Sequence, residues 1–261
     1  YECLEALELG GTLTVGGQIS TTSAGTSNFR AGVNAGNSIT SGGNYNTAVG
    51  DEAGTAITTG DENTAVGYQA LDANTTGNEN TAVGKLALDA NTTASYNTAM
   101  GSSALLNNTT GTKNTALGRS AMSGNVSADE NVAIGYYALV GNTTGANNVA
   151  VGAHALDANT TASYNTAVGH GTLGANTTGA QNIAVGASAL DANTTGNENT
   201  AVGYQALDAN TTASYNTAMG SSALTNNTTG TKNTALGRSA MSANVSADEN
   251  VAIGYYSLVV N

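Results

Sequence analysis

Asn63-Thr64-Ala65-Val66-Gly67 is the stretch that decides the fold, because close variants of it recur every 17 residues along the chain. Each copy is Asn, then Thr, Val or Ile, then Ala, then Val, Met, Leu or Ile, and finally Gly. The copies begin at Asn46, Asn63, Asn80, Asn97, Asn114, Asn131, Asn148, Asn165, Asn182, Asn199, Asn216, Asn233 and Asn250. A short period that never slips indicates a solenoid in which each repeat forms one coil.

The rest of the repeat is also patterned, and we number its positions 1 to 17 from the Asn that begins each copy. Position 8 is nearly always Ala and position 9 nearly always Leu or Met, while position 12 is Asn in nearly every coil. Polar residues fill the arc that follows. We therefore expect a structural frame that repeats in every coil and that consists, in one coil, of Asn63, Ala65, Val66, Gly67, Ala70, Leu71 and Asn74.

The first five positions predict a short β-strand, since they carry β-branched residues between turn formers and the repeat is too short for two helices. Coils stacked in parallel at about 4.8 Å each would make a rod roughly 60 Å long. We predict an all-β fold, a parallel β-solenoid (β-roll) of 17-residue coils. Gly at position 5 is expected to take a positive φ, and Asn at positions 1 and 12 to form ladders of stacked amides.

The two sides of this strand are expected to face different surroundings. Alternate residues of a strand point to opposite sides, so Ala65 points one way while Thr64 and Val66 point the other. A solitary solenoid would present a polar outer strand face, whereas both faces here are mostly apolar. No other part of this chain is large enough to cover the outer face, so the simplest partner for it is another copy of the chain. We predict a parallel homo-oligomer, most simply three chains around one axis.

Three parts follow from where the period holds. Residues 1–27 lack it, and their spaced Leu and paired Gly favour a connector or stalk of short strands, with the end of a helix as the alternative. Residues 28–45 form a degenerate capping coil with one extra residue before Asn46. Residues 46–261 form the regular shaft. Within it, residues 97–140 recur almost unchanged at 216–259, which is a shift of 119 residues or seven coils.

Composition excludes several classes of function. The 261 residues include 34 Gly but one Phe, no Trp and no Pro, so the interior has to be narrow. The net charge of −12, with six Lys and Arg, argues against nucleic acid and against an anionic membrane surface as partners. No apolar run is long enough for membrane insertion. Cys3 is the only cysteine, so an intrachain disulfide is impossible.

Three patterns resemble chemical sites, and each has a simpler structural explanation. Asp72-x-Asn74-x-x-Gly77 resembles part of a calcium loop without its closing Glu, and a turn rich in Asx and Thr explains it. His154 and His170 lie in adjacent coils without a third metal ligand. Asn-Thr-Thr matches the glycosylation sequon in most coils, as a periodic turn of this composition must. We expect no metal, no cofactor and no enzymatic activity.

Positions 6 and 7 vary freely and carry most of the tyrosines. Exposed tyrosines are typical of surfaces that contact protein or sugar, although stacking between neighbouring coils is the simpler explanation of the same residues. The candidate receptor-facing residues are Tyr68, Gln69, Tyr136, Tyr137, Tyr204, Tyr255 and Tyr256.

The combination Asn-Thr-Ala-Val-Gly-Tyr-Gln-Ala-Leu-x-x-Asn-Thr-Thr-Gly at residues 63–77 resembles the repeats found upstream of the endosialidase-type intramolecular chaperone in phage and giant-virus tail fibres. Its Asn-x-Ala-(Val/Ile)-Gly core is also similar to the head repeats of trimeric autotransporter adhesins, which form a left-handed β-roll as a parallel trimer. The resemblance covers residues 28–261. It implies a trimeric shaft with an extracellular location, in a virion tail fibre.

Our first hypothesis is a structural or adhesive segment of a tail fibre that projects toward, or binds, a host-surface receptor made of glycan or protein. A bacterial trimeric surface adhesin is the second, and an outer-membrane anchor encoded elsewhere in the same gene would distinguish it. An ice-binding solenoid is the third, since position 13 forms a Thr ladder that only Val126 and Val245 interrupt.

Overall fold

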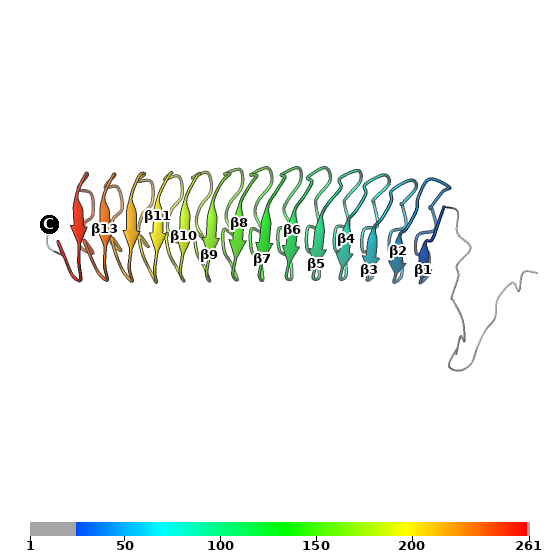
Figure 1. The fold of residues 1–261 in the computed structure, drawn as a ribbon, viewed down its shortest axis with the longest axis horizontal. Coiled ribbons are helices and arrows are strands. Elements are labelled where there is room, and N and C mark those ends of the chain that lie inside the picture. The colour runs from blue at the N-terminus through cyan, green and yellow to red at the C-terminus, as the bar shows by residue number, and fades with distance from the viewer. Residues whose placement is uncertain (1–24, 260–261) are drawn as a thin grey trace, which may run out of the picture.

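Fourteen strands of three residues each form one parallel sheet in the computed structural model, which describes residues 25–259 (Figure 1). The strands follow one another in chain order along one face of a rod. They are β1 Phe29–Ala31, β2 Thr47–Val49, β3 Thr64–Val66, β4 Thr81–Val83, β5 Thr98–Met100, β6 Thr115–Leu117, β7 Val132–Ile134, β8 Val149–Val151, β9 Thr166–Val168, β10 Ile183–Val185, β11 Thr200–Val202, β12 Thr217–Met219, β13 Thr234–Leu236 and β14 Val251–Ile253. Within the described range there is no helix, and so none that could span a membrane.

The register of the sheet follows the sequence period. From β2 to β14 each residue pairs with the residue 17 positions later, as Ala65 does with Ala82. Between β1 and β2 the offset is 18, because Phe29 pairs with Thr47. The predicted all-β parallel solenoid of 17-residue coils is therefore confirmed. Most of the predicted connector, residues 1–24, lies outside the described residues.

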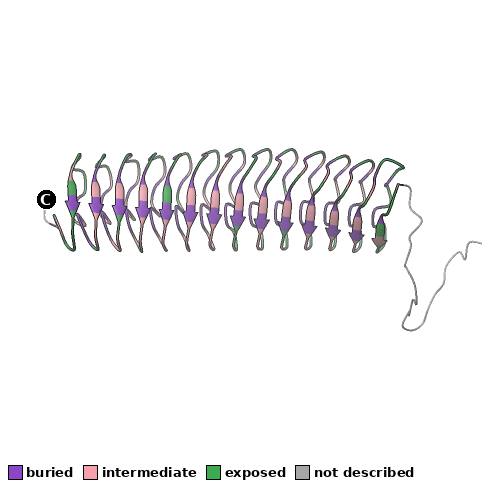
Figure 2. Ribbon diagram, viewed as in Figure 1, coloured by how far each residue is buried: buried purple, intermediate pink, exposed green. Residues whose placement is uncertain are grey.

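The interior is a narrow column of small and aliphatic side chains. Ala at positions 3 and 8 and Leu or Met at position 9 are buried in every regular coil before the last one, as Ala65, Ala70 and Leu71 illustrate. Figure 2 shows the buried middle residue of each regular strand. Ala at positions 3 and 8 leaves room for one larger side chain per layer, and position 9 supplies it.

Backbone conformations with positive φ turn the chain at four places in each coil. Gly67 at position 5 has a φ of +133°, as expected, and a Cβ there would lie 2.7 Å from the backbone of Gly84 in the next coil. Positions 7, 9 and 17 also have positive φ without glycine, as at Gln69, Leu71 and Glu79. This conformation costs a non-glycine residue about 1–2 kcal/mol. Burial of the Leu71 side chain opposes that cost, which explains why position 9 keeps a large aliphatic residue.

Two ladders of buried asparagines run along the rod and share one acceptor in each coil. At position 1, the Asn63 backbone N–H donates to Asn46 Oδ1 at 2.9 Å, and its Nδ2 donates to the Gly77 carbonyl at 2.8 Å. At position 12, Asn91 Nδ2 donates to Asn74 Oδ1 at 2.9 Å, and Asn74 Nδ2 donates to the same Gly77 carbonyl at 3.0 Å. Among the described residues no buried side-chain nitrogen or oxygen lacks a partner. Because this composition cannot provide a large hydrophobic core, the buried hydrogen bonds of the two ladders contribute much of the stability of the rod.

Candidate functional site

The outer face of the sheet is the first surface of interest. Side chains at positions 2 and 4 point away from the interior and are half-buried or exposed, in contrast to the buried position 3 between them. Ile183 is 47% exposed and Met219 is 45% exposed. The larger exposed apolar side chains on this face are Met100, Ile134, Ile183, Met219, Val251 and Ile253. An aliphatic residue at position 4 of every regular coil therefore forms a strip along the rod, beside position 2, which is Thr in nine of the thirteen regular coils. We call this surface the outer strand face.

The second surface is the column formed by positions 6 and 7, just after the Gly corner, which we call the tyrosine edge. Five of the seven predicted receptor-facing residues are exposed there, namely Tyr68, Tyr136, Tyr204, Tyr255 and Tyr256. The other two, Gln69 and Tyr137, are half-buried. Gln69 Nε2 donates to Glu52 Oε2 of the preceding coil at 2.8 Å, so this side chain is engaged within the rod.

Cations of the tyrosine edge lie over tyrosine rings of neighbouring coils. The Lys85 ammonium is 6.0 Å from the centre of the Tyr68 ring. The Arg119 guanidinium is 5.7 Å from the Tyr136 ring, and the Arg238 guanidinium is 5.7 Å from the Tyr255 ring. Such contacts stabilise exposed sites by about 0.5–1 kcal/mol. The sequence prediction did not include these cations, although reading position 6 down successive coils places each beside its tyrosine.

Aromatic contacts extend this arrangement across three coils. Tyr136 and Tyr137 meet edge to face with ring centres 4.4 Å apart, and Tyr137 stacks on His154 of the next coil with an angle of 3° between the rings. His154 Nδ1 lies 3.0 Å from Asp157 Oδ2, and the His170 ring is 6.3 Å from the His154 ring. The two histidines are therefore neighbours, and one of them belongs to the aromatic stack.

Carboxylates at position 10 form a half-buried acidic column. Burial, and secondarily the charge of Asp72, raises the pKa of Asp89. Burial likewise raises the pKa of Asp208, with a smaller contribution from the charge of Asp191. Burial is also the main reason that the pKa of Asp191 is raised, against a hydrogen bond from Gly174 that lowers it. Stacking carboxylates at this position therefore opposes folding slightly.

Positions 16 and 17 carry exposed polar contacts between coils. Lys113 Nζ lies 3.0 Å from Glu130 Oε1, and Lys232 Nζ lies 2.9 Å from Glu249 Oε1 in the corresponding coil seven repeats later. The Thr231 backbone and hydroxyl both donate to Asp248, which lowers the pKa of that carboxyl. These contacts account for two of the six cations.

The remaining sequence patterns have structural roles. Across residues 25–259, no three His, Cys, Asp or Glu side chains are grouped so that they could hold a metal ion. The sequon asparagines from Asn74 onward are those of the second ladder, where the amide is buried and hydrogen-bonded. Thr75 Oγ1 donates to the Thr92 carbonyl at 3.0 Å, so the position 13 hydroxyls bond within the rod.

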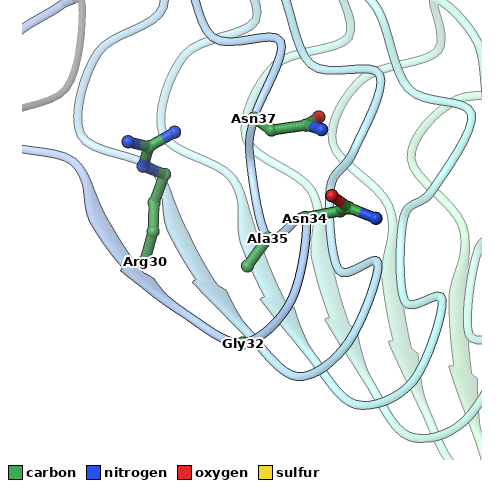
Figure 3. Close-up of a pocket in the computed structure, with 5 residues that line it drawn as sticks. All are labelled: Arg30, Gly32, Asn34, Ala35 and Asn37. Atoms are coloured by element: carbon green, nitrogen blue, oxygen red, sulfur yellow. The ribbon is translucent and has the colours of Figure 1, made fainter. Parts of the chain in front are cut away.

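A shallow hollow lies at the N-terminal end of the rod and is lined by Arg30, Gly32, Asn34, Ala35 and Asn37 (Figure 3). Arg30 pairs in register with Ala48, so it occupies the position that is Ala in every later strand. Its Nη1 donates to the Gly36 carbonyl at 2.9 Å. Arg30 therefore closes the end of the column of buried Ala side chains.

Comparison of the chain with protein families, with curated proteins and with solved structures found no match. The assignment of function therefore depends on the two surfaces of the rod itself.

Proposed function

We propose that this chain is a structural and adhesive segment of a trimeric, extracellular tail fibre of a phage or virus, which projects toward or binds a host-surface receptor. In this role the rod performs no catalysis. It sets distance and stiffness, while the tyrosine edge supplies the variable exterior.

The apolar outer strand face is the observation that carries this proposal. Three residues of strand are about 10 Å long and thirteen coils about 60 Å, so the outer strand face covers roughly 600 Å². The aliphatic side chains of position 4 supply about half of it, roughly 300 Å², which is the size of the largest apolar patch on many monomeric proteins. At about 25 cal/mol per Å², covering that half would contribute on the order of 8 kcal/mol per chain before the costs of association.

Three parallel copies around one axis suit the shape of this strip. Each copy is a straight rod with one apolar side, and a closed ring of three turns every such side inward without leaving a free interface. The resemblance to tail-fibre and adhesin repeats independently implies the same trimer, with a left-handed coil. The buried asparagine ladders and the continuous sheet support the stiffness that a spacer requires.

The contacts of the Thr ladder favour a fibre over an ice-binding solenoid. The hydroxyls at position 13, such as those of Thr75 and Thr194, donate to carbonyls of the next coil, and every threonine at this position except Thr160 is half-buried. An ice-binding face needs hydroxyls that meet water. A bacterial adhesin shares the trimer and remains the second candidate, which an outer-membrane anchor in the same gene would distinguish.

The mass of the assembled particle in solution tests the proposal. Light scattering after gel filtration should give three times the chain mass of 25.6 kDa, that is about 77 kDa. A double variant, Ile134→Asp with Met219→Asp, places charges on the outer strand face and is expected to dissociate the trimer. Thr110→Asp with Thr229→Asp adds the same charge at exposed position 14 and should leave the mass unchanged. A monomeric wild-type chain would refute the proposal.

A further inference from the structure

We propose that two places on the tyrosine edge bind a saccharide whose sugar rings carry carboxylates. The first is the Arg119 cluster, made of Arg119, Tyr136 and Tyr137. The second is the Arg238 cluster, made of Arg238, Tyr255 and Tyr256. This inference rests on the proposed function, because it names the class of receptor that the fibre segment would take.

The partners of the six cations single out these clusters. Lys113 and Lys232 are paired with glutamates, and Arg30 is bonded to a backbone carbonyl at the end of the rod. Lys85 is exposed and lies over a single ring, that of Tyr68, and it lacks the planar guanidinium of an arginine. Arg119 and Arg238 are exposed, and within residues 25–259 neither forms an ion pair with a carboxylate. On a chain of net charge −12, two guanidinium groups without acidic partners are local sites for an anion.

Each cluster combines a guanidinium with two aromatic rings. The Arg238 guanidinium lies 5.7 Å from the Tyr255 ring and 6.0 Å from the Tyr256 ring, and those two rings meet at 77° with centres 4.4 Å apart. Tyr136 and Tyr137 meet at 71° and the same distance beside Arg119. The rings are therefore held in nearly the same arrangement in both clusters.

The chemistry of these groups selects the ligand. A guanidinium presents its N–H groups as a planar fork that matches a carboxylate. The exposed rings of Tyr136, Tyr255 and Tyr256 provide amphipathic contact area at a low entropic cost, which suits the apolar side of a sugar ring. Tyr137 is half-buried and stacked on His154, so it supports Tyr136. A nucleic acid is a poor ligand, since tight binding to its backbone needs several basic groups side by side and each cluster has one. A sugar acid meets both requirements with one carboxylate per ring.

The spacing of the two clusters favours a polymeric saccharide over a short one as the ligand. Arg119 and Arg238 are 119 residues apart, which is seven coils, or about 34 Å along one side of the rod at about 4.8 Å per coil. Figure 1 shows the corresponding strands, β6 and β13, on the same face. A saccharide that reaches both clusters would bind more tightly than a short fragment, because the second contact is intramolecular.

Calorimetric titration with polygalacturonate, at low and at moderate salt, tests the proposal on the full chain. Polygalacturonate is the probe because it carries one carboxylate on every ring, and its methyl ester keeps the rings but removes the charge. The wild type should bind the acid at least about tenfold more tightly than the ester. Arg119→Gln with Arg238→Gln should weaken binding of the acid by at least about tenfold.

Lys113→Gln with Lys232→Gln is the matched control, because it changes the net charge equally but alters cations that are already paired. It should reduce binding by less than about twofold, and circular dichroism should show that both double variants are folded. No binding by the wild type, equal binding of the ester, or an equal loss in the control would each overturn the ligand assignment. A trimeric mass in that case would leave the fibre proposal standing, whereas a monomeric mass would refute the fibre proposal whatever the titration shows.

Discussion

Gly135→Ala is expected to destabilise the rod strongly, because position 5 is where neighbouring coils approach most closely. A Cβ on Gly135 would lie 2.5 Å from the Gly152 carbonyl oxygen, whereas ordinary contact begins at 3.4 Å, so the next coil must move by about 0.9 Å (3.4 − 2.5). That movement lengthens the hydrogen bond from the Gly152 N–H to the Ile134 carbonyl, which is 2.8 Å in the structure.

The expected magnitude combines two costs. A φ of +140° costs alanine about 1–3 kcal/mol. Losing one buried backbone hydrogen bond adds about 1–3 kcal/mol. The sum of about 2–6 kcal/mol corresponds to a fall in melting temperature of about 4–24 °C for a domain of this size.

Gly171→Ala is the matched control in the middle of the rod. Gly171 has a φ of +61°, but a Cβ there would meet only Ser188 Oγ, at 3.9 Å. Other coils already hold His154 and Ser188 at this position with a similar φ. Its effect should be limited to about 1–2 kcal/mol, the cost of a positive φ for alanine, because no neighbouring coil has to move.

Thermal unfolding followed by circular dichroism, together with guanidinium titration, measures both variants. Limited proteolysis should cut Gly135→Ala first near the junction of the coils that contain Gly135 and Gly152. If the two variants melt within a few degrees of each other, the close approach at position 5 does not set the spacing of the coils.

Three further predictions follow from the ladders, the acidic column and the long repeat. Asn148→Ala removes the acceptor of the Asn165 N–H and should cost about 2–4 kcal/mol in denaturant titration, whereas the exposed Asn107→Ala should cost less than about 1 kcal/mol. Asp208→Asn should stabilise the rod at pH 7 by a few tenths of a kcal/mol, because the raised pKa of Asp208 in the folded state means that its ionised form opposes folding. That advantage should shrink as the pH falls through the raised pKa toward the ordinary value of 3.8, and an advantage that persists at lower pH would contradict the assignment. Deleting residues 120–238 removes seven whole coils, joins Arg119 to Ser239 in register, and should leave a shorter folded rod by circular dichroism. Deleting 120–239 leaves one coil of 16 residues at the junction and should lower the melting temperature relative to the first deletion, because that coil cannot be in register with both of its neighbours.

The period of the sequence was enough to predict the coil, the inward Ala and the amide ladders, because each depends on a residue type that recurs at one position. Local reasoning could not predict the positive φ of Leu71, since that conformation is unfavourable for Leu and results from its burial against the next coil. The pairing of Arg119 with Tyr136 was missed for a different reason. Both occupy a position that varies between coils, and their contact becomes visible only when that position is read down the stack.

The asparagine ladders also give the rod a net dipole along its long axis. In every rung the side-chain Oδ1 accepts from the following coil, as Asn46 Oδ1 does from Asn63 and Asn74 Oδ1 does from Asn91. The backbone bonds between coils run both ways, since the Thr64 N–H donates forward to Asn80 while the Gly67 N–H donates backward to Val49. Their dipoles largely cancel, but the amide dipoles of both ladders add from one end to the other. No single rung can reverse without breaking its neighbours, so the polarity of the whole column is fixed as soon as the first few turns have closed.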